Sequence, residues 1–188
     1  MRPWLEFSPT DATKLSVLVD GNKEEGEFKP GHGEEARNIS VESQDPDVLR
    51  SIAEEAYHRQ QYDRAIPAFE KLADTGDNRY NDVAKLHHGK SLWRHGYYGN
   101  GETPKDQRLK TIKKAVELLR EASTHVDARY SAQAWYEMSK AYHKLWKLTG
   151  DGYFDEAYKA AEEAAKLDYQ MAYITWIERL DDEKVKAT

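Results

Sequence analysis

The chain has 188 residues, which is enough for one domain with a sizeable core or for a short stack of repeats. Charged residues make up 33% of it and the mean hydropathy is -0.93, a polar balance typical of thin helical layers that each expose an outer face. The net charge of -6 argues against general nucleic-acid affinity as the main function. Because cysteine is absent, disulfides, thiolate metal sites and cysteine nucleophiles are excluded.

Residues 1–44 differ in kind from the rest and form a predicted N-terminal arm. Leu15 to Val19 is a β-prone run that stops at the turn signal Asp20-Gly21-Asn22, and residues 38–42 are a second β-prone run. The charged, glycine-rich residues 23–37 between them are predicted to be a loop. Two interpretations remain open, a small hairpin packed on the helices and a mobile arm.

The same region lacks targeting signals. The apolar run from Leu15 to Val19 is far too short for the core of a signal peptide. No stretch approaches the roughly 20 apolar residues that a membrane-spanning helix needs. We therefore expect a cytoplasmic protein that makes no membrane contact.

Residues 49–73 describe two short helices folded against each other. Apolar residues recur at helical spacing in both halves, at Leu49, Ile52, Ala53 and Ala56 and then at Ala65, Ala68, Phe69 and Leu72. The polar residues 58–63 between them suit a turn. Asp45-Pro46-Asp47 is a strong helix start, and Pro67 is expected in the first turn of the second helix. Gly76-Asp77-Asn78 closes the pair.

A helical pair of this kind cannot bury its apolar faces alone, and the sequence supplies two further copies. The second copy has predicted helices at residues 83–95 and 109–123, with residues 96–107 as a loop. The third copy covers residues 131–167 and turns at residues 149–152. Residues 171–180 are predicted to be a capping helix on the third pair, followed by a tail at residues 181–188. The predicted fold is therefore an all-α stack of helical hairpins over residues 45–180.

Aligned with one another, the copies resemble the tetratricopeptide repeat, over about residues 47–168. The first-helix positions of the pattern are Leu49, Ile52, Ala53 and Ala56; Lys85, His88, Gly89 and Leu92; and Trp135, Met138, Ser139 and Tyr142. The second-helix positions are Ala65 with Phe69, Ala115 with Leu119, and Ala157 with Ala161. The copies start 36 and then 50 residues apart, so the regular repeat period is not kept.

The resemblance implies a concave surface lined by the first helix of each pair, and the non-core positions of those helices are the candidate partner-binding residues. They are Arg50, Glu54, Tyr57, His58, His87, Lys90, Trp93, Arg94, Tyr136, Glu137, Lys140, His143 and Lys144. Basic and aromatic side chains dominate this set, which predicts a groove for an acidic, partly apolar peptide segment. The chaperone-tail variant of the family uses Asn beside its bases, and no position in the set is Asn. The alternative is an ordinary solvated face.

Two patterns in the second copy suggest other chemistry. Ala84 to Ser91 has the loose spelling of a phosphate loop, but the segment is itself a predicted helix, in which Gly89 suits a close helix crossing. His87, His88 and His95 lack the acidic partners of a metal site, and a partly exposed polar helix face is the better interpretation. No nucleophile and base occur at a spacing that catalysis requires. We therefore expect no cofactor, no metal and no catalytic site.

The sequence favours a non-catalytic scaffold that binds a protein segment. A self-assembling structural or regulatory protein is the alternative, in which Trp176, Ile177 and the segment from Trp4 to Phe7 would make subunit contacts and give a homo-oligomer. Nucleic-acid binding by the basic, aromatic groove is disfavoured by the net negative charge.

Overall fold

The computed structural model describes residues 14–19, 22–27, 43–98, 103–150 and 152–187. The chain divides into two units, Met1–Ser40 and Val41–Thr188. In the first unit, strands β1 (Lys14–Val19) and β2 (Asn22–Glu27) pair antiparallel, from Lys14 opposite Glu27 to Val19 opposite Asn22. The predicted strand at Leu15 to Val19 is confirmed.

The second strand of this hairpin corrects the prediction, because residues 23–27 were expected to be a loop. Val19 pairs with Asn22, so the ladder extends to the end of both strands. The backbone pairing outweighs the weak strand propensity of the glutamate-rich β2. The β-prone residues 38–42 and the segment from Trp4 to Phe7 lie outside the described residues.

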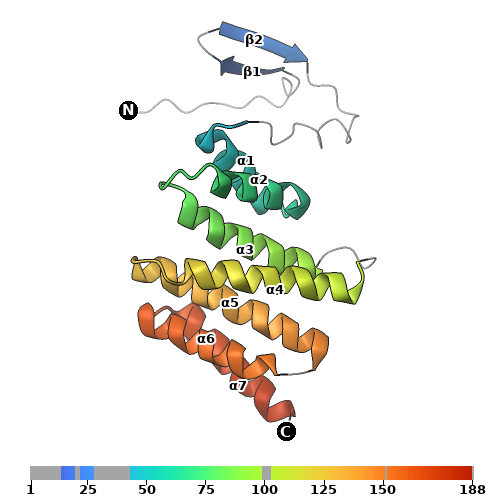
Figure 1. The fold of residues 1–188 in the computed structure, drawn as a ribbon, viewed down its shortest axis with the longest axis vertical. Helices are drawn as coiled ribbons and strands as arrows, with labels where there is room; N and C mark the ends of the chain where they lie inside the picture. Colours follow the sequence, from blue (N-terminus) through green and yellow to red (C-terminus); the bar gives the residue numbers. More distant parts are fainter. Residues whose placement is uncertain (1–13, 20–21, 28–42, 99–102, 151, 188) are drawn as a thin grey trace. The chain divides into compact units, whose positions relative to one another are not determined.

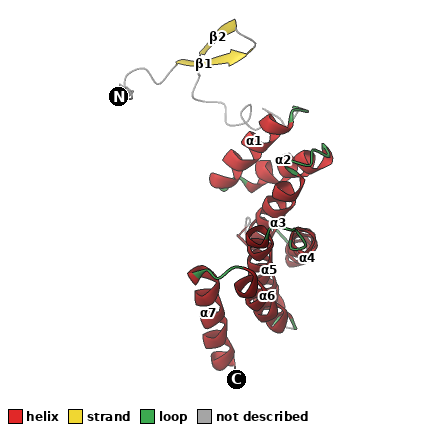
Figure 2. Ribbon diagram, turned by 90° about the vertical axis from the view of Figure 1, so that its left-hand side faces the viewer, coloured by secondary structure: helices red, strands yellow, loops and turns green. Residues whose placement is uncertain are grey.

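The second unit is a stack of helices in which each helix packs on the next along the chain (Figures 1 and 2). The helices are α1 (Pro46–His58), α2 (Tyr62–Asp74), α3 (Asn81–Tyr98), α4 (Lys105–Ala122), α5 (Ala128–Thr149), α6 (Tyr153–Leu167) and α7 (Met171–Ala187). They form three hairpins, α1 with α2, α3 with α4 and α5 with α6, followed by the single helix α7. Helices α3 and α5 also contact each other across the hairpins. The predicted all-α hairpin stack is confirmed for this unit.

The start of the stack has the predicted cap. Asp45 accepts a hydrogen bond from the backbone N–H of Asp47 at 2.9 Å, and Pro46 occupies the first helical position. The turn between α1 and α2 is shorter than predicted, and α2 already begins at Tyr62. Pro67 therefore lies in the second turn of α2 rather than in the first, where it removes one backbone donor from the helix.

Two glycines on α3 allow α3 and α4 to approach closely. A Cβ atom added to Gly89 would lie 2.7 Å from Cγ of Leu119, and one added to Gly96 would lie 2.8 Å from Cγ1 of Ile112. The helix-crossing role predicted for Gly89 is therefore confirmed. Gly96 was predicted to open a loop, but α3 continues to Tyr98, because Gly96 at this crossing is itself buried against α4.

Helix α7 covers the open end of the stack, as predicted for a capping helix. Tyr173, Trp176 and Leu180 are buried against α5 and α6, and the Trp176 indole N–H donates to Oγ of Ser139 at 2.7 Å. The helix runs to Ala187, so residues 181–187, predicted to be a tail, are helical. Within the described ranges, no helix is both long enough and apolar enough to cross a membrane.

Candidate functional site

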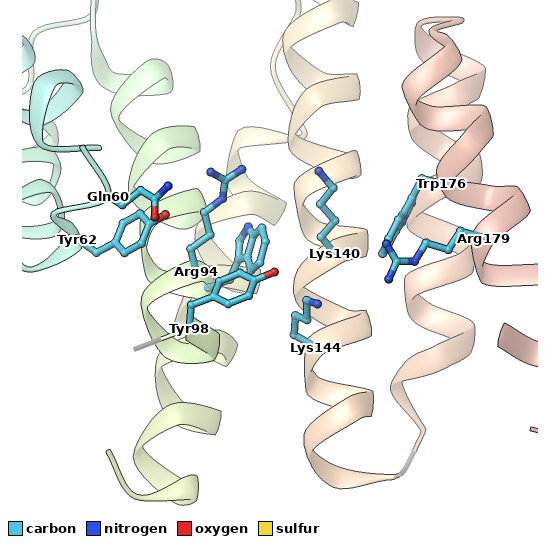
Figure 3. Close-up of a pocket in the computed structure, with 9 residues that line it drawn as sticks. Gln60, Tyr62, Arg94, Tyr98, Lys140, Lys144, Trp176 and Arg179 are labelled. Carbon is cyan, nitrogen blue, oxygen red and sulfur yellow. The ribbon is translucent and has the colours of Figure 1, made fainter. Parts of the chain in front are cut away.

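A cleft of about 500 Å³ extends across the helical unit, and we call it the groove. Its lining residues come from the α1–α2 turn, α2, α3, α5 and α7 (Figure 3). They are Gln60, Tyr62, Trp93, Arg94, Tyr98, Lys140, Lys144, Trp176 and Arg179. Of these described lining residues, four carry a positive charge and none carries a negative charge.

Helical spacing explains why these side chains meet. Residues four apart lie on one face of an α-helix, which places Arg94 with Tyr98 on α3 and Lys140 with Lys144 on α5. Each of the two helices presents the opposite face to the core. The stacking of α3, α5 and α7 then brings one cationic face from each helix to a shared surface.

A buried carboxylate lies beneath the groove. Glu137 on α5 is only 4% exposed, and its Oε2 accepts a hydrogen bond from the indole N–H of Trp93 at 3.1 Å. Its Oε1 lies 4.0 Å from Nη2 of Arg94 and 3.9 Å from Nζ of Lys140. A carboxylate is buried at low cost only when it is paired and hydrogen-bonded, so Glu137 is the internal counter-ion of these cations.

The positive charges around Glu137 exceed what it neutralises. Burial lowers the pKa of the Lys90 ammonium, and the neighbouring charges of Arg94 and Lys140 lower it further, although Glu137 opposes them. Burial also lowers the pKa of Lys144, with contributions from Arg179 and other nearby cations. Burial is thus the main cause of both lowered pKa values, and neighbouring cations add to it.

Aromatic rings support these cations. Nζ of Lys140 lies 3.8 Å from the ring centroid of Tyr136, and Nζ of Lys144 lies 4.2 Å from that of Tyr97. Cζ of Arg94 lies 5.3 Å from the ring of Tyr57. These cation–π contacts hold the charged ends in place and cover the faces of the rings.

The α7 side of the groove is held by a second network of charged side chains, centred on Glu183. Oε2 of Glu183 lies 2.9 Å from Nε2 of His143 and 2.7 Å from Nζ of Lys147, and its Oε1 lies 3.4 Å from Nε of Arg179. Burial alone would raise the pKa of Glu183, but hydrogen bonds from Lys147 and His143 outweigh it and lower the pKa to about 2. Glu183 therefore joins α7 to α5 as a carboxylate.

The structure brings together part of the set predicted from sequence. Trp93, Arg94, Lys140 and Lys144 line the groove. Tyr57, Lys90, Tyr136 and Glu137 lie beside it and contact the lining cations or share their field. Arg50 and Glu54 are not among the lining residues and pair with each other at 2.8 Å, and His58 is exposed at the end of α1.

Two of the predicted groove residues pack against other side chains and are not among the lining residues. His143 is 1% exposed and lies between the rings of Trp146 and Trp176, because its Nε2 binds Glu183. His87 stacks on the ring of Phe69 from α2, with centroids 5.6 Å apart, and its burial lowers its pKa to about 4. Both residues have a structural role here rather than a groove-facing one.

Sequence reasoning missed five lining residues, Gln60, Tyr62, Tyr98, Trp176 and Arg179. It assigned the groove only to the first helix of each complete pair. Helix α7 follows α6 as the first helix of a fourth pair would, so the same rule applied to α7 selects Trp176 and Arg179, three residues apart. Tyr98 was missed because α3 was predicted to end before it.

The phosphate-loop-like segment and the remaining histidine have structural roles. Ala84 to Ser91 is part of α3, and the hydroxyl of Ser91 donates to the His87 carbonyl at 2.8 Å. His88 was expected to be partly exposed, but it is 3% exposed beneath its neighbours. The described part of the chain holds no cluster of three potential His, Asp or Glu metal ligands. Trp176, considered above for subunit contacts, is 8% exposed and packs against Ala161 and Leu180 of its own chain.

The stacked hairpins α1–α2, α3–α4 and α5–α6 give this unit the architecture of a helical-repeat protein. The chain is similar in structure to one described as the first TPR of Spaghetti (RPAP3) bound to HSP90 peptide SRMEEVD, with a TM-score of 0.54 and 19% identity over 76% of this chain and 98% of that one. The fold of the helical unit is therefore a divergent tetratricopeptide-repeat-like fold. No family model matches the chain, and no curated protein matches it.

Proposed function

We propose that this protein is a non-catalytic scaffold that binds an acidic, partly apolar segment of a partner protein in the groove. One observation carries the proposal: the described lining combines Arg94, Lys140, Lys144 and Arg179 with no acidic side chain. The nearby carboxylates, Glu137 and Glu183, are already engaged with groups of the chain itself. An acidic ligand supplies the missing negative charge.

The apolar part of the ligand has a place beside the cations. Tyr62 and Tyr98 line the groove, and Tyr98 is 63% exposed, so its ring offers contact area to a ligand. The peptide in the similar structure, SRMEEVD, also combines acidic and apolar residues. The groove positions lack the Asn residues that mark the chaperone-tail variant, so we do not assign that variant's ligand to this protein. The proposed partner is defined by its chemistry alone, as an acidic and partly apolar segment.

An array of acidic heptapeptides tests this proposal. The array includes SRMEEVD, and each peptide is paired with a neutral analogue in which Glu and Asp are replaced by Gln and Asn. We expect binding to the acidic members and loss of about 3- to 10-fold in affinity in Lys144→Gln and in Arg94→Gln, since each removes one charge-assisted contact. Lys90 is left unchanged because it is buried, so reversing its charge would test folding instead.

A lysine outside the groove provides the matched control. Lys159 on α6 is exposed and is not among the groove residues, so Lys159→Gln removes the same charge without touching the groove. Its affinity is expected to stay at the wild-type value. Equal binding of acidic and neutral peptides, or equal effects of the Lys144 and Lys159 substitutions, would contradict the proposal that the groove binds the acidic segment.

A further inference from the structure

We propose that the preferred ligand of the groove is a phosphorylated segment of the partner, whose phosphate lies among Arg94, Lys140, Lys144 and Arg179. The inference rests on the proposed function and narrows its ligand. It is based on how the four cations are arranged, on the charge that they leave uncompensated, and on the aromatic faces that they cover.

The four cations face a common space from three helices. Arg94 extends from α3 and Arg179 from α7, while Lys140 and Lys144 lie between them on α5 (Figure 3). A guanidinium group binds phosphate oxygens through two parallel N–H donors, and an ammonium group adds a point charge. A tetrahedral phosphate accepts donors from several directions at once, whereas a planar carboxylate offers two oxygens.

The charge balance also favours a dianion. Glu137 lies near Arg94 and Lys140, and Glu183 lies near Arg179, which leaves Lys144 without a carboxylate among the described ion pairs. A carboxylate ligand adds one negative charge, whereas phosphoserine adds about 1.5 to 2 at neutral pH. Burial is the main cause of the lowered pKa of Lys144; Arg179, Lys147 and Lys140 lower it further, and the more distant carboxylate of Glu183 opposes them.

A phosphorylated peptide suits this surface better than a single-stranded nucleic acid. Bases bind proteins by stacking on open aromatic faces. Here Lys140 covers Tyr136, Lys144 covers Tyr97, and Cζ of Arg179 lies 5.5 Å from the ring of Trp176. The rings of Trp93 and Trp176 are both almost fully buried. Base stacking is therefore restricted at these rings, and Tyr98, which is 63% exposed, is the open ring among the described lining residues.

Fluorescence anisotropy with three labelled heptapeptides on the full chain tests the inference. The peptides are SRMESVD, SRMEEVD and SRMEpSVD, where pS is phosphoserine, so one position changes from neutral to one and then to about two negative charges. We expect the affinity to rise about tenfold from SRMEEVD to SRMEpSVD, as one or more added charge-assisted hydrogen bonds would give. Inorganic phosphate should compete with SRMEpSVD more effectively than acetate does.

Variants and pH identify the groups involved. Arg94→Gln and Arg179→Gln should each reduce the preference for SRMEpSVD over SRMEEVD, and Lys159→Gln should leave the preference unchanged. The preference should also grow between about pH 5.5 and about pH 7.5, because the second phosphate proton dissociates near pH 6. Retention of the full preference in both arginine variants would overturn the assignment.

The outcomes separate the two proposals. Equal affinity for SRMEEVD and SRMEpSVD, with both above SRMESVD, would overturn the phosphate preference and leave the acidic-peptide function standing. Absence of binding by all three peptides would count against both. An oligouridine that binds more tightly than SRMEpSVD and competes with it would overturn the inference in favour of nucleic acid.

Discussion

The indole N–H of Trp93 donates to Oε2 of Glu137 at 3.1 Å, which joins two residues that are 44 positions apart in the chain. The bond connects α3 to α5 directly beneath the groove, in a place where both side chains are almost fully buried. It fixes the carboxylate next to Arg94 and Lys140. Glu137 therefore stabilises the cationic surface and at the same time neutralises part of its charge.

Replacement of Glu137 by Gln should separate these two effects. The amide oxygen still accepts from Trp93, but the negative charge among the cations is lost. We expect the free energy of unfolding to fall by about 1 to 3 kcal/mol, because uncompensated buried charge is costly. Affinity for an acidic peptide should rise about threefold or more, because the internal competitor for the cations is removed.

Urea unfolding and peptide anisotropy measure the two changes. Glu156→Gln on α6 is the matched control, because Glu156 is exposed and pairs only loosely, at 4.0 Å, with Lys159. Neither quantity should change in that control. A Glu137→Gln protein that loses both stability and peptide affinity would show that Glu137 shapes the groove without opposing the ligand.

Glycine substitutions on α3 should depend on the closeness of α4. Gly89→Ala would place a methyl group 2.7 Å from Cγ of Leu119 and 3.3 Å from the Ala115 carbonyl oxygen, which forces the helices apart. We expect a loss of about 1 to 3 kcal/mol in the free energy of unfolding. Gly76 has a φ of +67° in open space, so Gly76→Asn should cost less, since Asn tolerates the left-handed region.

Urea unfolding midpoints of the two glycine variants test this difference. Gly76→Ala serves as the comparison, because it adds strain at positive φ without any steric clash. A Gly89→Ala protein as stable as the wild type would mean that α3 and α4 cross with more space than described.

Buried histidines should make the fold sensitive to acid. Burial lowers the pKa of His88 from its usual value of 6.5 to about 4, so the unfolded chain binds a proton there at pH values where the folded chain does not. Above about pH 6.5 His88 is neutral in both states and does not lower the free energy of unfolding. As the pH falls from there towards the folded-state pKa, the unfolded chain takes up a proton first and the free energy of unfolding decreases. Between pH 7 and pH 5 this residue alone should account for a loss on the order of 1 to 2 kcal/mol.

Unfolding free energies of the wild type and His88→Gln at several pH values test this expectation. The variant should show a smaller fall in stability between pH 7 and pH 5, whatever its stability at neutral pH. Identical pH profiles for His88→Gln and the wild type would contradict the proposed role of His88.

The capping helix should depend on one hydrogen bond in addition to packing. The Trp176 indole N–H donates to Oγ of Ser139 at 2.7 Å inside the α5–α7 contact. Trp176→Phe keeps an aromatic ring there but leaves the hydroxyl without its donor. We expect a loss of about 1 kcal/mol or more, together with faster amide hydrogen exchange in α7 than in α3. Unchanged exchange in α7 would show that packing alone holds the helix.

The sequence predicted the helical stack well because its signals are local. Periodic apolar residues and the Asp45 cap select helices without reference to distant parts of the chain. The errors arise where tertiary contacts decide the outcome. Gly96 has the sequence signature of a loop, but it is buried in α3 where a side chain would meet Ile112 of α4.

The groove was predicted less completely for the same reason. Arg94, Lys140 and Lys144 follow from helical spacing on one helix at a time. Whether a residue such as His143 faces the groove or the core depends on Glu183, forty residues later, which no local pattern reveals. Arg179 likewise joins the lining only because α7 packs where a fourth pair would begin.

Photo-crosslinking tests the central claim, that the groove is the ligand-binding surface, most directly. A heptapeptide library built from Glu, Asp, Leu and Met and carrying a benzophenone group would be crosslinked to the full chain and mapped by mass spectrometry. If the peptide binds in the groove, crosslinks should form at Tyr98, Lys140, Lys144 and Arg179 and should decrease in the presence of unlabelled SRMEEVD. Crosslinks concentrated instead on the α4 and α6 surfaces, around Lys113 and Lys159, would contradict it.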